Sequence, residues 1–196
     1  MSNQMDDSEL IERFLAGDGS CFDRLIERYQ HMVFNVCMKM LGNYDDALDL
    51  SQDIFLKLYT SLGQFRGRAK FSTYLYRICM NYCKNRIARY SRRRRHEPFS
   101  KDAPVSTADG GQRERQFAAD GPSPRDAAAA RQREALLRDA VHSLPADFRE
   151  VIVLKEFQGL KYEEIAAVLE IEPGTVKSRL SRARQALKEK VKKYGL

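Results

Sequence analysis

The sequence predicts an all-α protein with two helical domains joined by a flexible linker. Apolar residues recur every three or four positions along most of the chain, whereas the alternating pattern of strands is nearly absent. Glycine and capping residues stand at the ends of these helical patterns. Across residues 91–130 the periodicity gives way to Ser, Asp, Gly, Pro and Ala, a composition that cannot form a core. We therefore expect one domain at residues 1–90 and another at residues 131–196.

The first domain is expected to contain four helices. Their predicted ranges are residues 8–16, 20–41, 44–63 and 71–90, with glycines 17, 42 and 63 closing the first three. The four cysteines have no CxxC spacing, and each falls within an apolar helical pattern. We interpret them as reduced core residues, namely Cys21, Cys37, Cys79 and Cys83.

The third predicted helix carries acidic side chains on its outward face. Asp49 and Asp53 stand one turn apart and repel each other, which local helix stability does not explain. We infer a docking surface for a basic protein partner, with ordinary solvated acids as the alternative interpretation. The residues of this surface are Asp46, Asp49, Gln52 and Asp53.

The fourth predicted helix and the basic loop before it have the features of a single-stranded nucleic acid site. Basic, amide and aromatic side chains are mixed on one side of the helix, where cations can follow phosphates and rings can stack on bases. Helical aromatic residues also often belong to a core, so both interpretations stay open. The outward residues are Thr73, Tyr76, Arg77, Met80, Asn81, Lys84 and Asn85.

The second domain is expected to end in a helix-turn-helix. A short helix at residues 162–169 is followed by a break, and a second helix runs from about Thr175 to Lys193, with Glu189 as its only acid. Such a pair offers the N-terminal half of its second helix to a DNA major groove. The alternative is a solvated basic helix. Two preceding helices, one from roughly Pro124 or Arg131 to Ser143 and one from Pro145, should cover its apolar side. The inward residues of the second are Phe148, Val151, Ile152 and Phe157.

Composition and charge restrict the classes of function. A net charge of +7 and a pI near 9.3 make an anionic partner the expectation. The N-terminus lacks the features of a signal peptide, and no apolar run approaches ~20 residues, so neither export nor membrane insertion is expected. The histidines are dispersed, and nucleotide-binding and hydrolase motifs are absent, so we expect no metal, no cofactor and no enzymatic activity.

Several short motifs resemble those of the extracytoplasmic-function group of bacterial sigma-70 family sigma factors. In the first domain, residues 49–55 (DLSQDIF) and 71–78 (FSTYLYRI) are similar to the family segments DLxQxxF and FSTWLYRI. In the second domain, residues 144–145, 162–166 and 174–179 are similar to LP, YEEIA and GTVKSR. Five such motifs occur in order at suitable spacing. Tyr74 stands where the family usually has tryptophan.

The resemblance implies a cytoplasmic factor that brings core RNA polymerase to promoter DNA and is regulated by an anti-sigma factor. The acidic surface would then bind the clamp coiled coil of the beta-prime subunit, and the beta flap would be a second contact. The −10 element would be bound by Arg66, Arg68, Lys70, Phe71, Thr73, Tyr76, Arg77, Asn81, Lys84 and Asn85. The −35 element would be bound by Thr175, Lys177, Ser178, Arg179, Ser181, Arg182 and Arg184.

Other classes of function remain as alternatives at this point. A stand-alone helix-turn-helix regulator of duplex operators would explain the C-terminal domain but not the acidic surface or the basic aromatic helix. An RNA-binding adaptor would be favoured if the basic run Arg92–Arg95 dominated nucleic acid affinity. A gel shift discriminates the first alternative, because a repressor binds its duplex alone and a sigma factor binds promoters well only with core polymerase.

Overall fold

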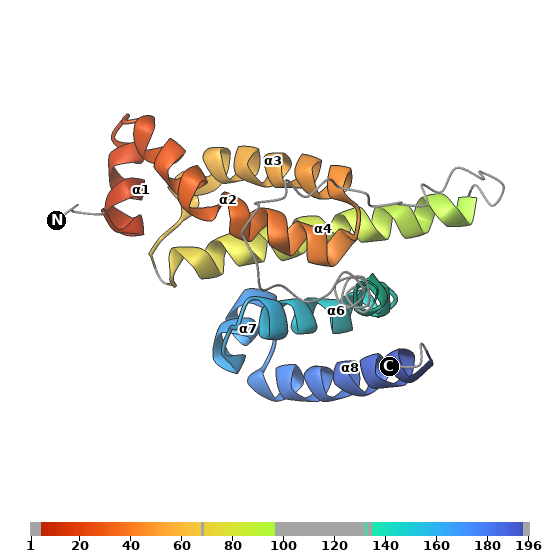
Figure 1. Ribbon diagram of the computed structural model, residues 1–196. Coiled ribbons are helices and arrows are strands. Elements are labelled where there is room, and N and C mark those ends of the chain that lie inside the picture. The colour runs from red at the N-terminus through yellow and green to blue at the C-terminus, as the bar shows by residue number, and fades with distance from the viewer. Residues whose placement is uncertain (1–4, 68, 97–131, 133–134, 194–196) are drawn as a thin grey trace, which may run out of the picture.

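The computed structural model describes residues 5–67, 69–96, 132 and 135–193, and these form helices without a strand. Two groups of helices, one before and one after the interval 97–131, lie against each other (Figure 1). The predicted all-α fold with two helical domains is therefore confirmed. No helix in the described ranges combines the length and the apolarity needed to cross a membrane.

The first domain consists of α1 (Asp7–Leu15), α2 (Ser20–Leu41), α3 (Tyr44–Ser61), a short 3-10 turn (Leu62–Gln64) and α4 (Phe71–His96). Gly42 ends α2 with φ of 80°, and the Asn43 side chain then accepts a hydrogen bond from Asp46 N at 3.0 Å, which starts α3. The four cysteines are buried and free, as predicted. The centre of the core is made by Leu10, Leu25, Val33, Met40, Leu50, Ile54, Leu58 and Leu75.

Helix α4 is longer than the sequence pattern suggested. It continues to His96, so residues 91–96 are helical where we expected the linker to begin. Arginine is a good helix former, and the first residue that disfavours a helix is Pro98, which restricts the residue before it. The remainder of the expected linker lies outside the described residues.

The second domain begins with a helical segment at residues 135–142, followed by α6 (Ala146–Ile152), a π-helical turn η2 (Val153–Phe157), α7 (Tyr162–Leu169) and α8 (Pro173–Lys193). The expectation that Phe157 points inward is wrong, because its side chain is 39% exposed. A π turn inserts an extra residue and rotates the positions after it, which moves Phe157 away from the apolar face of α6. The Lys39 ammonium lies over its ring at 4.6 Å.

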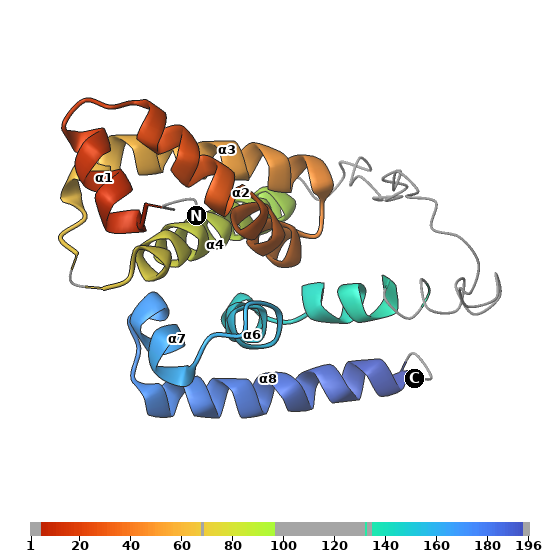
Figure 2. The same cartoon turned by 60° about the vertical axis from the view of Figure 1, so that its left-hand side comes forward.

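The two domains meet along α4 of the first domain. In the two views the second domain lies on one side of α4, and α8 is its outermost helix, far from the first domain (Figure 2). Arg149 is buried at this junction and donates to the Met40 carbonyl at 2.5 Å and the Leu144 carbonyl at 3.1 Å. His142 lies beside Gly42 so closely that a Cβ on Gly42 would stand 2.8 Å from the imidazole Nε2.

His142 gives the junction a pH dependence. Burial and the nearby cations Arg149, Arg138 and Lys39 lower the pKa of His142 from 6.5 to about 4. Between these values the unfolded chain binds more protons than the folded chain, so the contribution of His142 to stability falls as the pH drops from 6.5 to 4.

Replacement of His142 should therefore make stability less dependent on pH. We expect the free energy of unfolding of His142→Gln, measured by urea titration, to fall less than that of the wild type between pH 6.5 and 4. An equal fall in both proteins would contradict this.

Candidate nucleic-acid and protein interfaces

The outer face of α8 presents polar and basic side chains around one shallow groove. The groove runs between Tyr162 at the start of α7 and the exposed side of α8. Lys177 and Ser181 from the predicted −35 set line it, while Arg182 is exposed nearby. Neither Lys177 nor Arg182 has a hydrogen bond or ion pair to another residue in the described part of the chain. Besides Tyr162, the residues that line the groove are Lys177, Leu180, Ser181, Arg184, Gln185 and Lys188.

Two arginines of the same set are already paired within the domain. Arg179 contacts Glu150 Oε1 at 3.2 Å, and Glu150 is only 2% exposed. Burial raises the pKa of Glu150, which its neighbours Lys84 and Arg179 oppose. Arg184 reaches Glu156 Oε1 with Nε at 3.1 Å and a terminal nitrogen at 2.7 Å. These acids fix the directions of both guanidinium groups at the edges of the α8 surface.

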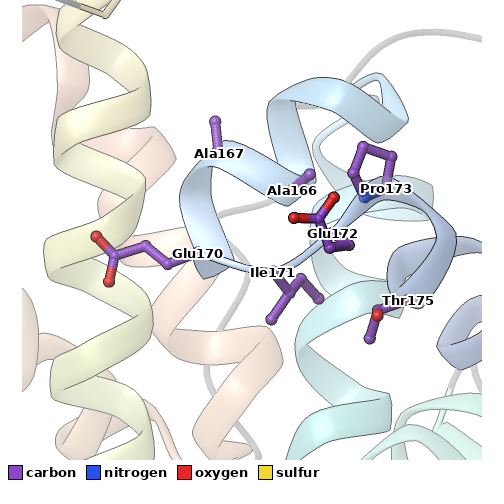
Figure 3. Close-up of a pocket in the computed structure, with 7 residues that line it drawn as sticks. All are labelled: Ala166, Ala167, Glu170, Ile171, Glu172, Pro173 and Thr175. Atoms are coloured by element: carbon purple, nitrogen blue, oxygen red, sulfur yellow. The ribbon is translucent and has the colours of Figure 1, made fainter.

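The turn of the helix-turn-helix forms a second hollow (Figure 3). Thr175 of the −35 set lines it at the beginning of α8, and the Ser178 hydroxyl donates to the Thr175 carbonyl at 3.0 Å. Glu170 also borders this hollow, and its side chain extends toward α4 (Figure 3). The residues that line the hollow at the turn are Ala166, Ala167, Glu170, Ile171, Glu172, Pro173 and Thr175.

The residues predicted for the −10 element fall into an exposed and a buried group. Arg66, Lys70, Asn81 and Asn85 are exposed, and Arg77 and Lys84 are half-buried. Phe71, Thr73 and Tyr76 are buried, as is Met80, so the expectation of outward side chains at 73, 76 and 80 is wrong. For Tyr76 the reason is the second domain, because its hydroxyl donates to Gln158 Oε1 at 3.1 Å. Arg68 lies outside the described residues.

An aromatic cluster supports the loop that precedes α4. Rings of Tyr29, Phe71, Phe65 and Tyr74 follow one another with centroid distances of 5.3, 5.7 and 5.3 Å. Tyr74 also donates to the carbonyl of buried Ser61 at 3.2 Å. The tyrosine that stands in the usual tryptophan position thus anchors the start of α4 to the end of α3.

On α3 the acidic residues are not equivalent. Arg86 of α4 pairs with Asp46 at 3.5 Å and with Asp53 at 3.3 Å, and the Tyr90 hydroxyl also donates to Asp46. Asp49 and Gln52 are exposed and have no such partner within the described ranges. Sequence periodicity could not reveal these pairs, because they join residues distant in the chain.

The sequence analysis also missed exposed apolar residues next to Asp49. Leu48 is 41% exposed and Leu56 is 68% exposed, although large aliphatic side chains usually lie inside. At 100° per residue, both project on the same side of α3 as Asp49 and Gln52. The surface therefore combines apolar contact area with two acids, Asp45 and Asp49, that have no partner within the described residues. We call it the α3 surface, and it is made of Asp45, Leu48, Asp49, Gln52, Leu56 and Tyr59.

Among the residues that the structure describes, no group of His, Cys, Asp and Glu has the arrangement needed to hold a metal ion. The surfaces that remain for function are therefore the basic face of α8, the cationic side of α4 with its preceding loop, and the α3 surface.

Two family models match the chain in the same order as the two domains. The model for sigma-70 region 2 matches residues 25–93, which include α3 and nearly all of α4. The model for sigma-70 region 4 matches residues 131–187, which include α7 and most of α8.

Full-length relatives agree with these matches. The chain is 36% identical over 187 residues to the RNA polymerase sigma-H factor of Pseudomonas aeruginosa, covering 95% of this chain and 94% of the relative. It is also 36% identical over 196 residues to the ECF RNA polymerase sigma-E factor of Escherichia coli K12, with 97% of each chain covered.

Solved structures show the same fold. The sigma factor RpoE of Bartonella quintana, solved with the anti-sigma factor NepR, superposes with a TM-score of 0.61 and 26% identity, covering 87% of this chain and 96% of that chain. CnrH, solved with the cytosolic domain of CnrY, gives a TM-score of 0.66 at 22% identity, covering 95% and 97%.

We expect the hydrogen bond of Tyr74 to contribute to the stability of the first domain. Tyr74→Phe keeps the ring in the aromatic cluster but leaves the buried Ser61 carbonyl without this donor, which should cost about 1 kcal/mol of unfolding free energy. Urea denaturation followed by circular dichroism measures the change. Tyr59→Phe is the matched control, because Tyr59 is exposed. Equal stability of the two variants would contradict the role assigned to the hydroxyl.

Proposed function

The chain belongs to the extracytoplasmic-function group of sigma-70 family sigma factors, and we propose that it uses the three surfaces described above to direct core RNA polymerase to promoters. The presence of a cationic surface on each helical domain, with a separate acidic and apolar surface on α3, supports this division of roles. A stand-alone operator-binding protein would leave the α3 surface without a partner.

The α3 surface is the proposed contact with the clamp coiled coil of the polymerase beta-prime subunit. Asp49 supplies an unpaired charge for a basic partner, while Leu48 and Leu56 supply apolar area that becomes buried on binding. We infer that Asp46 and Asp53 act differently from our sequence-based expectation, because both already pair with Arg86. We assign them a positioning role that fixes α3 on α4. A contact of the second domain with the beta flap remains part of the proposal.

The cationic side of α4 and the preceding loop are the proposed −10 site. Lys70, Arg77 and Lys84 would follow the phosphates of the non-template strand, with Asn81 and Asn85 able to hydrogen-bond bases. Binding energy for an extruded base would drive strand separation, so the opening of the duplex needs no nucleotide hydrolysis.

The exposed face of α8 is the proposed −35 site. Lys177, Ser181 and Arg182 are exposed, and in the major groove they would read base edges. Arg179 and Arg184, held in place by Glu150 and Glu156, would position the helix on phosphates. Thr175 and Ser178 lie at the beginning of α8, where helices commonly approach the DNA backbone.

The proposal extends to the regulation and the site of action of the protein. Bartonella quintana RpoE was solved with an anti-sigma factor, and we infer a partner of that class for this chain. We also infer that the chain acts in the cytoplasm, next to polymerase and chromosome, and performs no catalytic reaction itself.

Run-off transcription tests the proposed function directly. Purified core polymerase and the full chain would be incubated with a library of promoter-length duplexes, and transcripts would be sequenced. We expect initiation at a restricted group of sequences only when the chain is present. Absence of chain-dependent initiation at every member would refute the proposed function.

Charge reversal at Asp49 should weaken binding to the core polymerase. An arginine at this exposed position would place like charges together, so Asp49→Arg should reduce affinity at least roughly tenfold. Competition with a labelled wild-type chain for purified core measures this effect. Glu27→Arg on α2 is the matched control, because it makes the same charge change at another exposed site. The docking assignment fails if both variants compete equally well.

Removal of Arg182 should affect recognition of the −35 element. Arg182→Ala should reduce binding of the holoenzyme by about 1–3 kcal/mol and relax base preference at one position. Gel shifts with promoters substituted at each −35 position provide the measurement. Lys193→Ala removes one charge from the far end of the same helix and should leave the base preference unchanged. An unaltered preference profile in Arg182→Ala would exclude this arginine from base recognition.

A further inference from the structure

The C-terminal end of α4 extends beyond the helices on which α4 packs. Figure 1 shows this end passing the ends of α2 and α3. Every residue from 88 to 93 is exposed, whereas a helix that packs on a core buries side chains along one face. We call residues 88–93 the α4 extension. It adds no buried side chain to the first domain, so the core does not explain its presence.

The α4 extension is cationic and contains no acid. Its cations are Arg89, Arg92 and Arg93, and like charges one turn apart on a helix repel each other. The helix dipole offsets part of this repulsion near a C-terminus. Arg89 forms no ion pair with another residue in the part of the chain that the structure describes. Arg92 Nε donates to the Ala88 carbonyl of the same helix at 3.4 Å, which supplies no counter-charge.

Contacts with α3 hold the extension from one side only. Arg86, just before it, pairs with Asp46 at 3.5 Å and with Asp53 at 3.3 Å. The Tyr90 hydroxyl also donates to Asp46. At 100° per residue, Arg92 lies about 160° around the helix from Tyr90. The contacts that anchor α4 on α3 therefore leave Arg92 on the opposite side of the helix.

Arg92 continues the face of α4 that the proposed −10 site uses. At 100° per residue, Arg77, Asn81, Lys84 and Arg92 fall within an arc of about 80°. The distance along the helix axis from Arg77 to Arg92 is about 22 Å at 1.5 Å per residue. Successive nucleotides of one strand rise 3.4 Å, so this distance corresponds to about six or seven nucleotides. DNA that follows this face from Arg77 thus meets the extension six or seven nucleotides farther along, by the same approximate measure.

The side chains of the extension favour duplex DNA over other partners. Single-stranded nucleic acid is held by exposed rings, and Tyr90, the one ring among residues 88–93, is bonded to Asp46. Protein interfaces have an apolar centre, for which the extension offers Ala88 and the same tyrosine. Guanidinium groups without neighbouring amides or rings suit the phosphates of a double helix.

The paired DNA next to the −10 element is the spacer on its −35 side. Transcription requires separated strands at the start site, so the DNA between the −10 element and that site opens. The spacer between the two recognised elements remains double-stranded. A cationic helix end beyond the −10 face would therefore meet the backbone of this spacer.

We propose that the α4 extension is a backbone contact for duplex DNA, in which Arg89 and Arg92 bind phosphates of the spacer next to the −10 element. This inference rests on the proposed function, because it adds a contact to the same promoter complex. Phosphates are the same in every sequence, so the contact contributes affinity and position but no base preference. In this respect it differs from the proposed −35 site on α8.

The test compares two double variants of the full chain, each bound to core polymerase. Arg89→Gln with Arg92→Gln removes both proposed phosphate contacts, and the helix should persist because glutamine and arginine have similar helix propensities. Arg13→Gln with Arg24→Gln is the matched control, since it removes the same charge from exposed positions of α1 and α2. Circular dichroism of the free chains measures whether both variants keep their helices.

Two probes from a promoter found by run-off transcription separate the spacer from the −10 element. The short probe is the single-stranded −10 segment, and the long probe adds the duplex spacer. At low salt we expect the first double variant to bind the long probe roughly fivefold more weakly than the control, and the short probe equally well.

Three results would overturn the proposal. Equal binding of the long probe by both variants would show that the arginines make no contact with the spacer. An equal loss on both probes would place their effect on the −10 strand. A lower affinity of the first double variant for core polymerase, measured without DNA, would indicate a protein partner instead.

Salt dependence adds a measurement that needs no promoter. Each lost phosphate contact reduces the slope of log K against log salt by about 0.9, so on duplex DNA of random sequence the first double variant should give a slope shallower than the control by about 1.8. Equal slopes would refute the contact. A larger loss on single-stranded RNA than on the duplex would assign the extension to RNA and would also refute it.

The two proposals can fail separately. If run-off transcription succeeds and the slopes on random duplex are equal, only the contact of the α4 extension fails. If no promoter is found, the proposed function fails, whereas the slopes still show whether Arg89 and Arg92 bind the backbone of duplex DNA.

Discussion

The positive charge of α4 is the constraint on which the rest of the structure depends. One side of this helix is apolar and completes the core of the first domain, while the other sides carry cations and no acid. Several of these cations pair with acids of α3 or of the second domain. Asp46 and Asp53 pair with Arg86, and Glu150, Glu164 and Glu170 pair with Lys84, Lys70 and Arg77. Apolar burial holds the helices together, and these pairings add charge complementarity to their arrangement.

Much of the fold could be predicted because the spacing of apolar residues and the residues at helix ends indicate a helix from local sequence alone. The limits of α7 coincide with the predicted residues 162–169, and α3 begins at residue 44, as the predicted range 44–63 requires. The exposed basic face of α8 also agrees with the prediction, because that prediction depends only on helical periodicity and on the absence of acids in the helix before Glu189. Local signals of this kind do not require knowledge of what packs against each helix.

The expectations that failed concern partners distant in sequence. Tyr76 was expected outside because nothing near it in sequence indicated that Gln158 would cover it. The ion pair of Asp53 with Arg86 was not foreseen, because Arg86 lies on another helix; the docking role of Asp53 stays a prediction. Phe157 was misplaced for a local reason, since a π turn breaks the periodicity on which the interpretation relied. In the candidate sites, the kind of side chain was therefore easier to predict than whether that side chain is exposed and unpaired.

Arg149 has a consequence for how freely the two domains can diverge during evolution. Its guanidinium binds the carbonyl oxygens of Met40, His142 and Leu144, which are main-chain atoms that every amino acid provides. Substitutions at those three positions keep the acceptor oxygens, whereas a substitution of Arg149 removes the donor. Chimeras that join this C-terminal domain to a region 2 from a relative should thus retain the anchoring, provided that the backbone at the end of α2 keeps its course.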